Sequence, residues 1–264
     1  MNIFIQEFKI SVVSALYWTA AMTLFILFFM LMYPPIAAQA QVMENLLNNF
    51  PLEIRRALGI TTMNLSELLG FYGFIFIYVL LIGSVYAMKA GLSGLSEEIR
   101  SGSVDFLLAK PVSRLAVATA KTSSLLTNIL IQNLLFLTAA FFIVGAYQDS
   151  SFDKSVFLQV NLSLIQSQLF FAALGAFTAV IAHKIKSPLP IALAIVFIFY
   201  ILQMLNDALG DGKLLYISPF AYFSTPRIIE QGIIEWHFVL LNLLISTILI
   251  SLSFCLYQRK DLPA

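Results

Sequence analysis

LLGFYGFIFIYVLLIGSVYAM, residues 68–88, is a run of 21 residues without a single charged side chain. A helix of about 20 mainly apolar residues is long enough to cross the hydrocarbon core of a bilayer. The stretch therefore predicts a membrane-spanning helix. The rest of the sequence shows how many such helices the chain has.

The composition of the whole chain also indicates a membrane protein. Of its 264 residues, 60% are hydrophobic and 11% are charged, whereas a soluble domain has about 25% charged residues. The one Cys excludes a disulfide framework within the chain and a multi-thiolate metal site. The formal net charge of +1 gives no reason to expect a nucleic-acid partner. Residues 1–11 lack the basic start and cleavage site of a secretory signal, so we expect the first span to be retained.

Five further apolar runs resemble residues 68–88 in length and composition. We expect spanning helices at residues 14–33, 68–88, 124–146, 156–182, 189–205 and 234–257. No Gly/Ser linker or low-complexity tract separates them. The sequence therefore predicts an all-α integral membrane protein with six transmembrane helices in a single domain, residues 1–264.

Lys and Arg residues between the spans predict the orientation of the chain. One side would hold both termini, the loop 89–121 and the loop 183–187, with ten of the 15 basic residues. These ten are Lys9, Lys89, Arg100, Lys110, Arg114, Lys121, Lys184, Lys186, Arg259 and Lys260. The other side holds five basic and nine of the 14 acidic residues. Because basic residues concentrate in cytoplasmic loops, we expect a multi-pass protein of the bacterial cytoplasmic membrane with both termini inside.

Several shorter helices are predicted outside the spans. Phe4, Ile5, Phe8 and Val12 recur at helical spacing, which favours an interfacial helix before the first span. The alternative is that the first span simply begins early.

The predicted extracellular loops also contain helical and aromatic patterns. In residues 34–66, apolar residues follow a helical period, and a short helix is expected over 51–58 with Gly59 just after its end. In the last outer loop, aromatic residues suit the belt at the membrane surface. They are Tyr216, Phe220, Tyr222 and Phe223.

Residues 96–114, SEEIRSGSVDFLLAKPVSR, connect the second and third spans and differ from both. We expect the helix of the second span to continue through residues 96–100, which would form its last cytoplasmic turn. Ser103 is a suitable N-cap for a short helix over 104–109, with Asp105 favourably placed near its positive end. Pro111 ends this element. The stretch therefore predicts an elbow of two helical pieces.

The same stretch carries side chains that suit contact with another protein. Ile99, Phe106 and Leu107 form an apolar cluster, which would have no use in a solvated loop. Acidic residues, including Glu97 and Glu98, accompany the basic ones. The ordinary alternative is a basic loop that only follows the charge rule for cytoplasmic segments.

This stretch resembles the corresponding segment in membrane subunits of type-2 ABC exporters. In that family, a Glu-rich turn precedes Gly-Ser/Thr, an acidic-Leu-Leu run and Pro-Val-Ser-Arg. The matching positions are Glu97, Glu98, Gly102, Ser103, Asp105, Leu107, Leu108, Pro111, Val112, Ser113, Arg114 and Lys121. The resemblance extends to the six spans, to FPLEIRRALG (50–59) and to YISPF (216–220), and it is most specific at the cytoplasmic stretch.

The resemblance implies a permease subunit that works with separate proteins. Residues 96–114 would be the coupling region, which docks in a groove of an ABC ATP-binding subunit present in two copies. The docking residues would be Glu97, Glu98, Ile99, Gly102, Ser103, Asp105, Phe106, Leu107 and Arg114. ATP and Mg would bind to that partner, with no cofactor and no ATPase site on this chain. A second permease copy, or a sister permease, would complete the dimer.

The resemblance also implies that the second and fifth spans line the translocation path. This places Tyr72, Tyr78, Tyr200 and Gln203 in the path. Because these side chains are aromatic or uncharged, the expected substrate is amphipathic, peptide or lipid-like.

Polar residues inside the other spans have a structural interpretation. Asn128, Gln132 and Gln166 suit hydrogen bonds between helices, because polar groups in lipid need partners. The alternative is that these three residues line the substrate path. The small residues Ala172, Gly175, Ala176 and Ala179 predict a close helix contact.

The sequence also bears on three other functions. GDGK (210–213) is followed by Leu214 and lacks the spacing of a phosphate loop. Gly-Leu-Ser-Gly (91–94) lacks a suitably placed histidine base, which makes an intramembrane protease a poor interpretation. A non-transporting membrane anchor or regulatory scaffold would share every feature described above and stays an alternative.

Overall fold

The computed structural model describes residues 3–60, 63–101, 114–147, 152–182, 185–210, 212 and 214–259. Within these ranges the chain is helical and contains no strand. The long helices are α1 (Ile3–Met30), α5 (Leu68–Ser101), α7 (Arg114–Gly145), α8 (Lys154–Ile181), α9 (Pro188–Leu209) and α12 (Trp236–Arg259). The short ones are α2 (Tyr33–Ala38), α3 (Ala40–Asn48), α4 (Leu52–Ala57), α10 (Pro219–Tyr222) and α11 (Thr225–Gln231). Helices suit a chain in lipid because they satisfy their backbone hydrogen bonds internally.

Six helices in the described ranges are long and apolar enough to cross a membrane. They are α1, α5, α7, α8, α9 and α12, which confirms the predicted number. The predicted ranges overlap all six, but α5 ends at Ser101 rather than 88, and α7 starts at Arg114 rather than 124. An apolar run marks only the part of a helix that lies in hydrocarbon, whereas the backbone hydrogen bonds continue beyond it.

The first span differs from its prediction. α1 is one helix of 28 residues from Ile3 to Met30, so the structure does not confirm a separate interfacial helix. The range contains neither Gly nor Pro to interrupt it. At about 1.5 Å per residue, α1 is about 42 Å long and exceeds the hydrocarbon core of about 30 Å. The first span therefore begins early.

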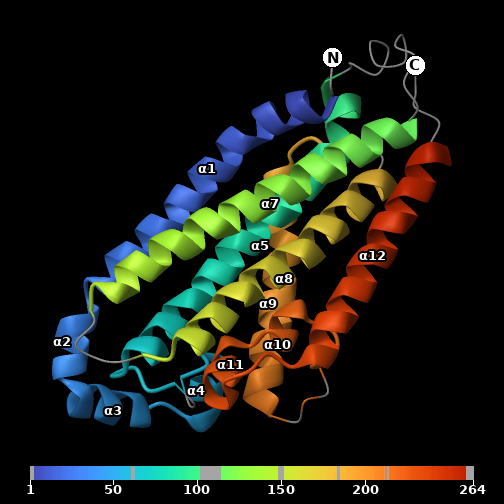
Figure 1. Cartoon of the computed structure of the whole chain (residues 1–264). Helices are drawn as coiled ribbons and strands as arrows, with labels where there is room; N and C mark the ends of the chain where they lie inside the picture. Colours follow the sequence, from blue (N-terminus) through green and yellow to red (C-terminus); the bar gives the residue numbers. More distant parts are fainter. Residues whose placement is uncertain are drawn as a thin grey trace.

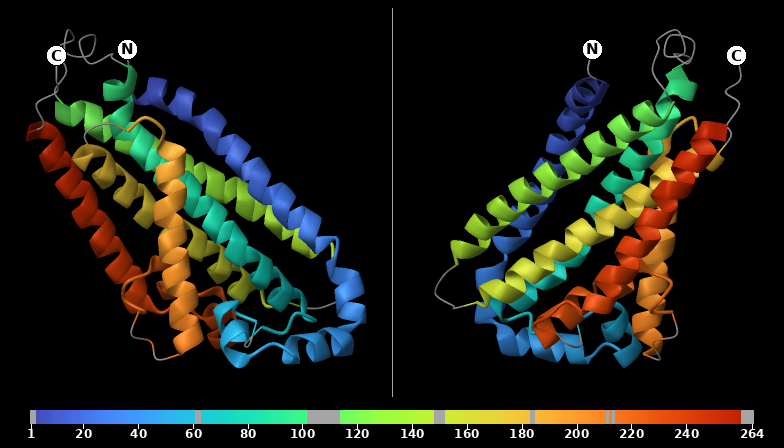
Figure 2. Two further views of the ribbon diagram at one scale, coloured as in Figure 1. Left: turned by 180° about the vertical axis from the view of Figure 1, so that it is seen from behind. Right: turned by 45° about the vertical axis from the view of Figure 1, so that its right-hand side comes forward.

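α5 and α8 form the centre of the molecule. In the most apolar 18 residues of these two spans, 67% and 61% are buried, against 22%, 22% and 17% in α1, α9 and α12. Figures 1 and 2 show α1 and α7 on one side of this pair and α12 on the other. The outer helices therefore present most of their apolar surface to the surroundings, as expected in lipid.

Two glycines allow α5 and α8 to approach closely. A Cβ on Gly91 of α5 would lie 2.3 Å from the backbone oxygen of Ala172, and a Cβ on Gly175 of α8 would lie 2.5 Å from that of Met88. Both distances are far below van der Waals contact. Ala172, Ala176 and Ala179 are buried beside them, which confirms the helix contact predicted from the small residues.

The two ends of the molecule differ in character. The start of α1, the end of α5, the start of α7 and the end of α12 lie together at one end (Figure 1). The short helices α2–α4, α10 and α11 gather at the other end (Figure 2). We call these the terminal end and the capped end.

The short helix α4 matches its sequence pattern. It runs from Leu52 to Ala57, with Pro51 at its N-cap, inside the predicted range 51–58. Gly59 follows with φ +70°, a conformation that favours glycine. A Cβ there would also meet Pro226 Cγ at 3.0 Å. Gly59 therefore brings the end of α4 against α11.

The aromatic residues near α10 have a different role from the predicted one. Phe220, Tyr222 and Phe223 are buried, and Tyr216 alone of the four is exposed. Tyr222 stacks against Phe238 of α12 with ring centroids 5.3 Å apart. Burial raises the pKa of the Tyr222 phenol, and its hydroxyl donates to the Tyr216 carbonyl. Phe220, Tyr222 and Phe223 therefore pack the capped end together, and of the four predicted belt residues Tyr216 stays exposed to the surroundings.

Candidate functional site

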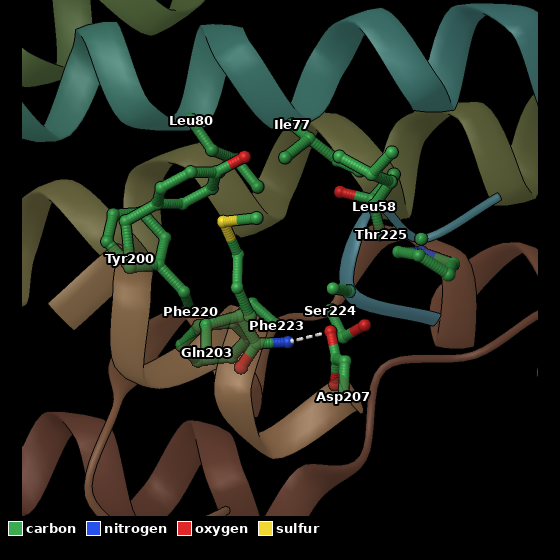
Figure 3. Close-up of a pocket in the computed structure, with 14 residues that line it drawn as sticks. Leu58, Ile77, Leu80, Tyr200, Gln203, Asp207, Phe220, Phe223, Ser224 and Thr225 are labelled. Atoms are coloured by element: carbon green, nitrogen blue, oxygen red, sulfur yellow. Dashed lines mark hydrogen bonds between the residues drawn. The ribbon is translucent and has the colours of Figure 1, made fainter. Parts of the chain in front are cut away.

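A pocket lies at the capped end between α5, α9 and the short helices (Figure 3). Its volume is about 40 Å³, which is room for a few water molecules. α5 contributes Ile77 and Leu80, and α9 contributes four residues. The remaining walls come from the end of α4 with the two residues after it and from residues 220–226. The lining residues are Ala57, Leu58, Gly59, Ile77, Leu80, Tyr200, Gln203, Met204, Asp207, Phe220, Phe223, Ser224, Thr225 and Pro226.

One wall of the pocket is polar and comes mainly from the last turns of α9. Gln203 Nε2 donates to Asp207 Oδ2 at 2.7 Å (Figure 3). Asn206 Nδ2 lies 3.4 Å from Asp207 Oδ1. Asp207 follows Gln203 by four residues, so the helix places the two side chains on the same face. The two amides hold the carboxylate of Asp207 in place.

Several oxygens around this wall have no hydrogen-bond partner among the described residues. They are Gln203 Oε1, Asn206 Oδ1 and Thr225 Oγ1, all buried. Buried polar atoms usually have a partner, either protein or water. Gln203 and Thr225 line the pocket and, with the Asp207 carboxylate, form its polar side opposite apolar and aromatic side chains, whereas Asn206 lies outside the lining. A space of about 40 Å³ is sized for water molecules, which would donate hydrogen bonds to these oxygens.

The structure brings together only part of the predicted translocation path. Tyr200 and Gln203 line the pocket, and Tyr200 packs edge-on against Phe220 at 6.1 Å between centroids. Tyr78 lies outside the pocket lining and packs against Phe25 of α1 at 6.2 Å. Tyr72 is fully buried, and its hydroxyl donates to Asn161 Oδ1 of α8 at 3.0 Å. In the single chain Tyr72 therefore contributes to the α5–α8 contact and does not face a cavity.

Sequence reasoning missed Asp207, Leu58 and Thr225 as pocket residues. Gln203 and Asp207 stand four residues apart at the end of an apolar run, and this spacing is a usable signal for a shared polar face. No sequence signal connects Leu58 or Thr225 to α9, because they belong to other elements: Leu58 follows α4, and Thr225 begins α11.

The predicted coupling region is only partly within the described residues. Glu97, Glu98 and Ile99 belong to the last turns of α5, and Arg114 is the first residue of α7. The predicted continuation of the second span through residues 96–100 is therefore confirmed. Gly102, Ser103, Asp105, Phe106 and Leu107 lie outside the described residues. Both flanking helix ends are at the terminal end of the molecule (Figure 1).

Asn128, Gln132 and Gln166 each contact another helix. Asn128 Nδ2 donates to Ser11 Oγ of α1 at 2.7 Å. Gln132 Oε1 accepts from Gln168 Nε2 of α8 at 3.1 Å. Gln166 Oε1 accepts from Asn242 Nδ2 of α12 at 3.1 Å. These bonds connect α1, α7, α8 and α12 in one series, and none of the three residues lines the pocket at the capped end.

Comparisons with known proteins agree with the helical arrangement. A family model described as ABC-2 family transporter protein matches residues 1–262, nearly the whole chain. No individual relative matches the chain in the comparison with curated proteins. The matched range contains all six of the long helices named above.

Proposed function

Because the chain belongs to the ABC-2 family of transporter permeases, we propose that it is the transmembrane subunit of a bacterial ABC exporter. Permeases of this family are membrane subunits that work with a separate ATP-binding subunit. In this proposal, two such subunits bind and hydrolyse ATP on the cytoplasmic face. Two permease copies, or this chain and a sister permease, form the path. The substrate is amphipathic, peptide or lipid-like.

The observation that carries this proposal is the continuity of α5. This helix has 34 residues, or about 51 Å at 1.5 Å per residue. Ile77 and Leu80 of α5 line the pocket at the capped end, and Glu97 and Glu98 belong to the same helix at the terminal end. A continuous helix transmits displacement as a rigid element. A movement imposed on residues 96–114 would therefore reach the pocket.

The close contact between α5 and α8 extends this argument. Gly91 and Gly175 allow backbone-to-backbone contact, and such tightly packed surfaces resist compression. α5 and α8 would therefore move as one body relative to α9, whose Tyr200, Gln203 and Asp207 form the opposite wall of the pocket. Such a movement would open and close the pocket during the ATP cycle.

Reconstitution separates an exporter from a non-transporting anchor or scaffold. The permease and its ATP-binding subunit would be placed in vesicles, and ATP hydrolysis would be measured with and without candidate amphipathic compounds. An exporter hydrolyses ATP faster in the presence of its substrate and moves that compound across the vesicle membrane. If no compound stimulates ATP hydrolysis and none crosses the vesicle membrane, the scaffold function is favoured.

Mutation of the coupling region tests the docking of the ATP-binding subunit. We expect Phe106→Ala combined with Leu107→Ala to release that subunit or to uncouple hydrolysis from transport. Apolar anchors at the centre of an interface cost about 2 kcal/mol or more when truncated, whereas charges at the rim cost far less. Lys110→Ala is the matched control and should retain the partner. Co-purification of the two subunits, at equal permease expression, gives the result. If the double mutant still binds the ATP-binding subunit and transports at the normal rate, the stretch is an ordinary loop.

A further inference from the structure

A second pocket lies at the terminal end, far from the one between α5 and α9. Its volume is about 290 Å³, and α1, α5, α7 and the first residue of α9 form its walls. The lining residues are Glu7, Ile10, Ser11, Ser14, Tyr86, Lys89, Ala90, Ser93, Gly94, Lys121, Ser124, Leu125 and Pro188. Two lysines, four serines, one tyrosine and one glutamate therefore line one cavity.

The charged side chains of this pocket have different partners. Lys121 Nζ pairs with Glu7 Oε1 at 3.0 Å, and its side chain is 5% exposed. Lys89 Nζ donates to Ser14 Oγ at 3.4 Å. Within the described part of the chain, Lys89 has no carboxylate in ion-pair distance. The two lysines and Glu7 leave a formal charge of +1, and the ammonium of Lys89 is the group that best attracts an anion.

The pocket also reaches the lipid-facing surface. Ile10 of α1 lines it and is 59% exposed. Val13, Leu16 and Tyr17 continue the exposed surface along this helix, at 52%, 47% and 73%. Lys89 immediately follows the apolar run 68–88 and lies near the end of the candidate span Leu68–Gly94, a position from which a lysine side chain reaches the lipid headgroups. A polar, positively charged cavity thus opens beside an apolar strip of α1.

We propose that this pocket binds the phosphate headgroup of an anionic phospholipid, with its acyl chains along the exposed strip of α1. Lys89 supplies the opposing charge, and the hydroxyls of Ser14, Ser93 and Ser124 supply neutral hydrogen bonds. The Ser11 hydroxyl, by contrast, already donates to the Glu7 carbonyl at 2.7 Å. Basic pockets between spanning helices are suited to such headgroups. The lipid would hold α1 against α5 at the end from which the coupling region extends. This inference needs only a membrane location and not the export activity proposed above.

The test measures lipid binding to the purified full-length permease without its ATP-binding partner. Phosphatidylglycerol, phosphatidylcholine and inorganic phosphate are titrated separately, and native mass spectrometry counts the bound molecules. We expect phosphatidylglycerol to bind in preference to phosphatidylcholine. Lys89→Gln should weaken its binding about tenfold, the effect of losing one charge-assisted hydrogen bond. Lys89→Arg, which keeps the charge, should retain most of the binding.

Two further variants keep the test decisive. Lys9→Gln removes the same charge from an exposed position of α1 outside the pocket, and it should leave binding unchanged. Gly94→Leu fills the cavity without a charge change, because a Cβ at Gly94 meets nothing within 4 Å, and it should weaken binding even if Lys89→Gln does not fold. The site would be refuted if Lys9→Gln and Lys89→Gln lost phosphatidylglycerol binding equally, or if Gly94→Leu bound this lipid normally. Displacement of phosphatidylglycerol by millimolar inorganic phosphate would show a soluble-anion site and refute the lipid.

Discussion

Gln168 illustrates how single polar residues hold this molecule together. It is fully buried in α8. Its Nε2 donates to Gln132 Oε1 at 3.1 Å and to the Gly83 carbonyl at 3.3 Å, while its Oε1 accepts from Asn133 Nδ2 at 2.6 Å. One side chain thus connects α8 to both α7 and α5. Inside a membrane protein, such bonds add specificity to packing that apolar side chains alone cannot give.

The first prediction concerns this residue. Gln168→Leu keeps the approximate size but leaves Gln132 Oε1 without a partner among the described residues. We expect the free energy of unfolding to fall by about 1–3 kcal/mol, the cost of an unsatisfied buried polar group. Thermal unfolding of the detergent-solubilised permease measures it. Thr138→Ala is the control, because Thr138 is exposed and bonds only its own helix, to the Leu134 carbonyl at 2.7 Å. Equal stability of the two variants would mean that the Gln168 bonds contribute nothing net.

At the scale of elements, the α5–α8 pair determines the architecture. Every other spanning helix contacts at least one member of this pair. The pair depends on Gly91 and Gly175, where the backbones meet without room for a Cβ. Gly94, one turn further along α5, has open space around it instead. Two glycines of one helix therefore have opposite structural roles.

The second prediction compares these two glycines of α5. Gly91→Ala should destabilise the fold by about 1–3 kcal/mol, because its Cβ would press on the Ala172 carbonyl and force the helices apart. Gly94→Ala should be neutral or stabilising by about 0.5–1 kcal/mol, because alanine costs less backbone entropy in a helix. Both substitutions add the same methyl group, so the difference isolates the helix contact. Melting temperatures of the two variants give the comparison. Similar values would refute close α5–α8 packing.

At the scale of the whole molecule, six spans place the start of α1 and the end of α12 at the same end (Figure 1). The segment between α5 and α7 leaves from this end too. If ATP-binding subunits dock on that segment, the terminal end must face the cytoplasm. The distribution of ten basic residues against five supports the same orientation.

The third prediction tests this orientation. A reporter enzyme that is active only outside the cytoplasm, fused after Ala264, should be inactive, whereas the same reporter in the α9–α10 connection, after Gly212, should be active. The basic residues near the terminal end favour its retention in the cytoplasm. The two fusions are compared at equal expression. Activity after Ala264 together with silence after Gly212 would reverse the topology and exclude docking of a cytoplasmic ATP-binding subunit on residues 96–114.

Much of the fold could be predicted because hydrocarbon imposes strict local rules. An uncharged apolar run as long as 68–88 is expected to be a spanning helix. Gly59 marks the end of α4 because glycine readily adopts the positive φ found there. The continuity of α1 was not predicted, because the amphipathic spacing at Phe4 and Phe8 favours an interfacial helix, although an early start of the span produces the same pattern. Of the site, the sequence indicated Tyr200 and Gln203 through resemblance, but it also indicated Tyr72, which is buried against Asn161.

By itself, the amino-acid sequence determined the helical class, the number of spans, the charge asymmetry and the small-residue contact of α8. These properties depend on the residues of one segment and on the solvent around it. Only the tertiary structure decided that Phe220 and Tyr222 are buried, that Leu58 and Thr225 meet Asp207, and that Lys89 and Lys121 share a cavity. Each of these facts depends on which helices are neighbours. Apolar faces in lipid are chemically alike, so hydrophobicity alone does not select among neighbours, and shape complementarity between the helices does.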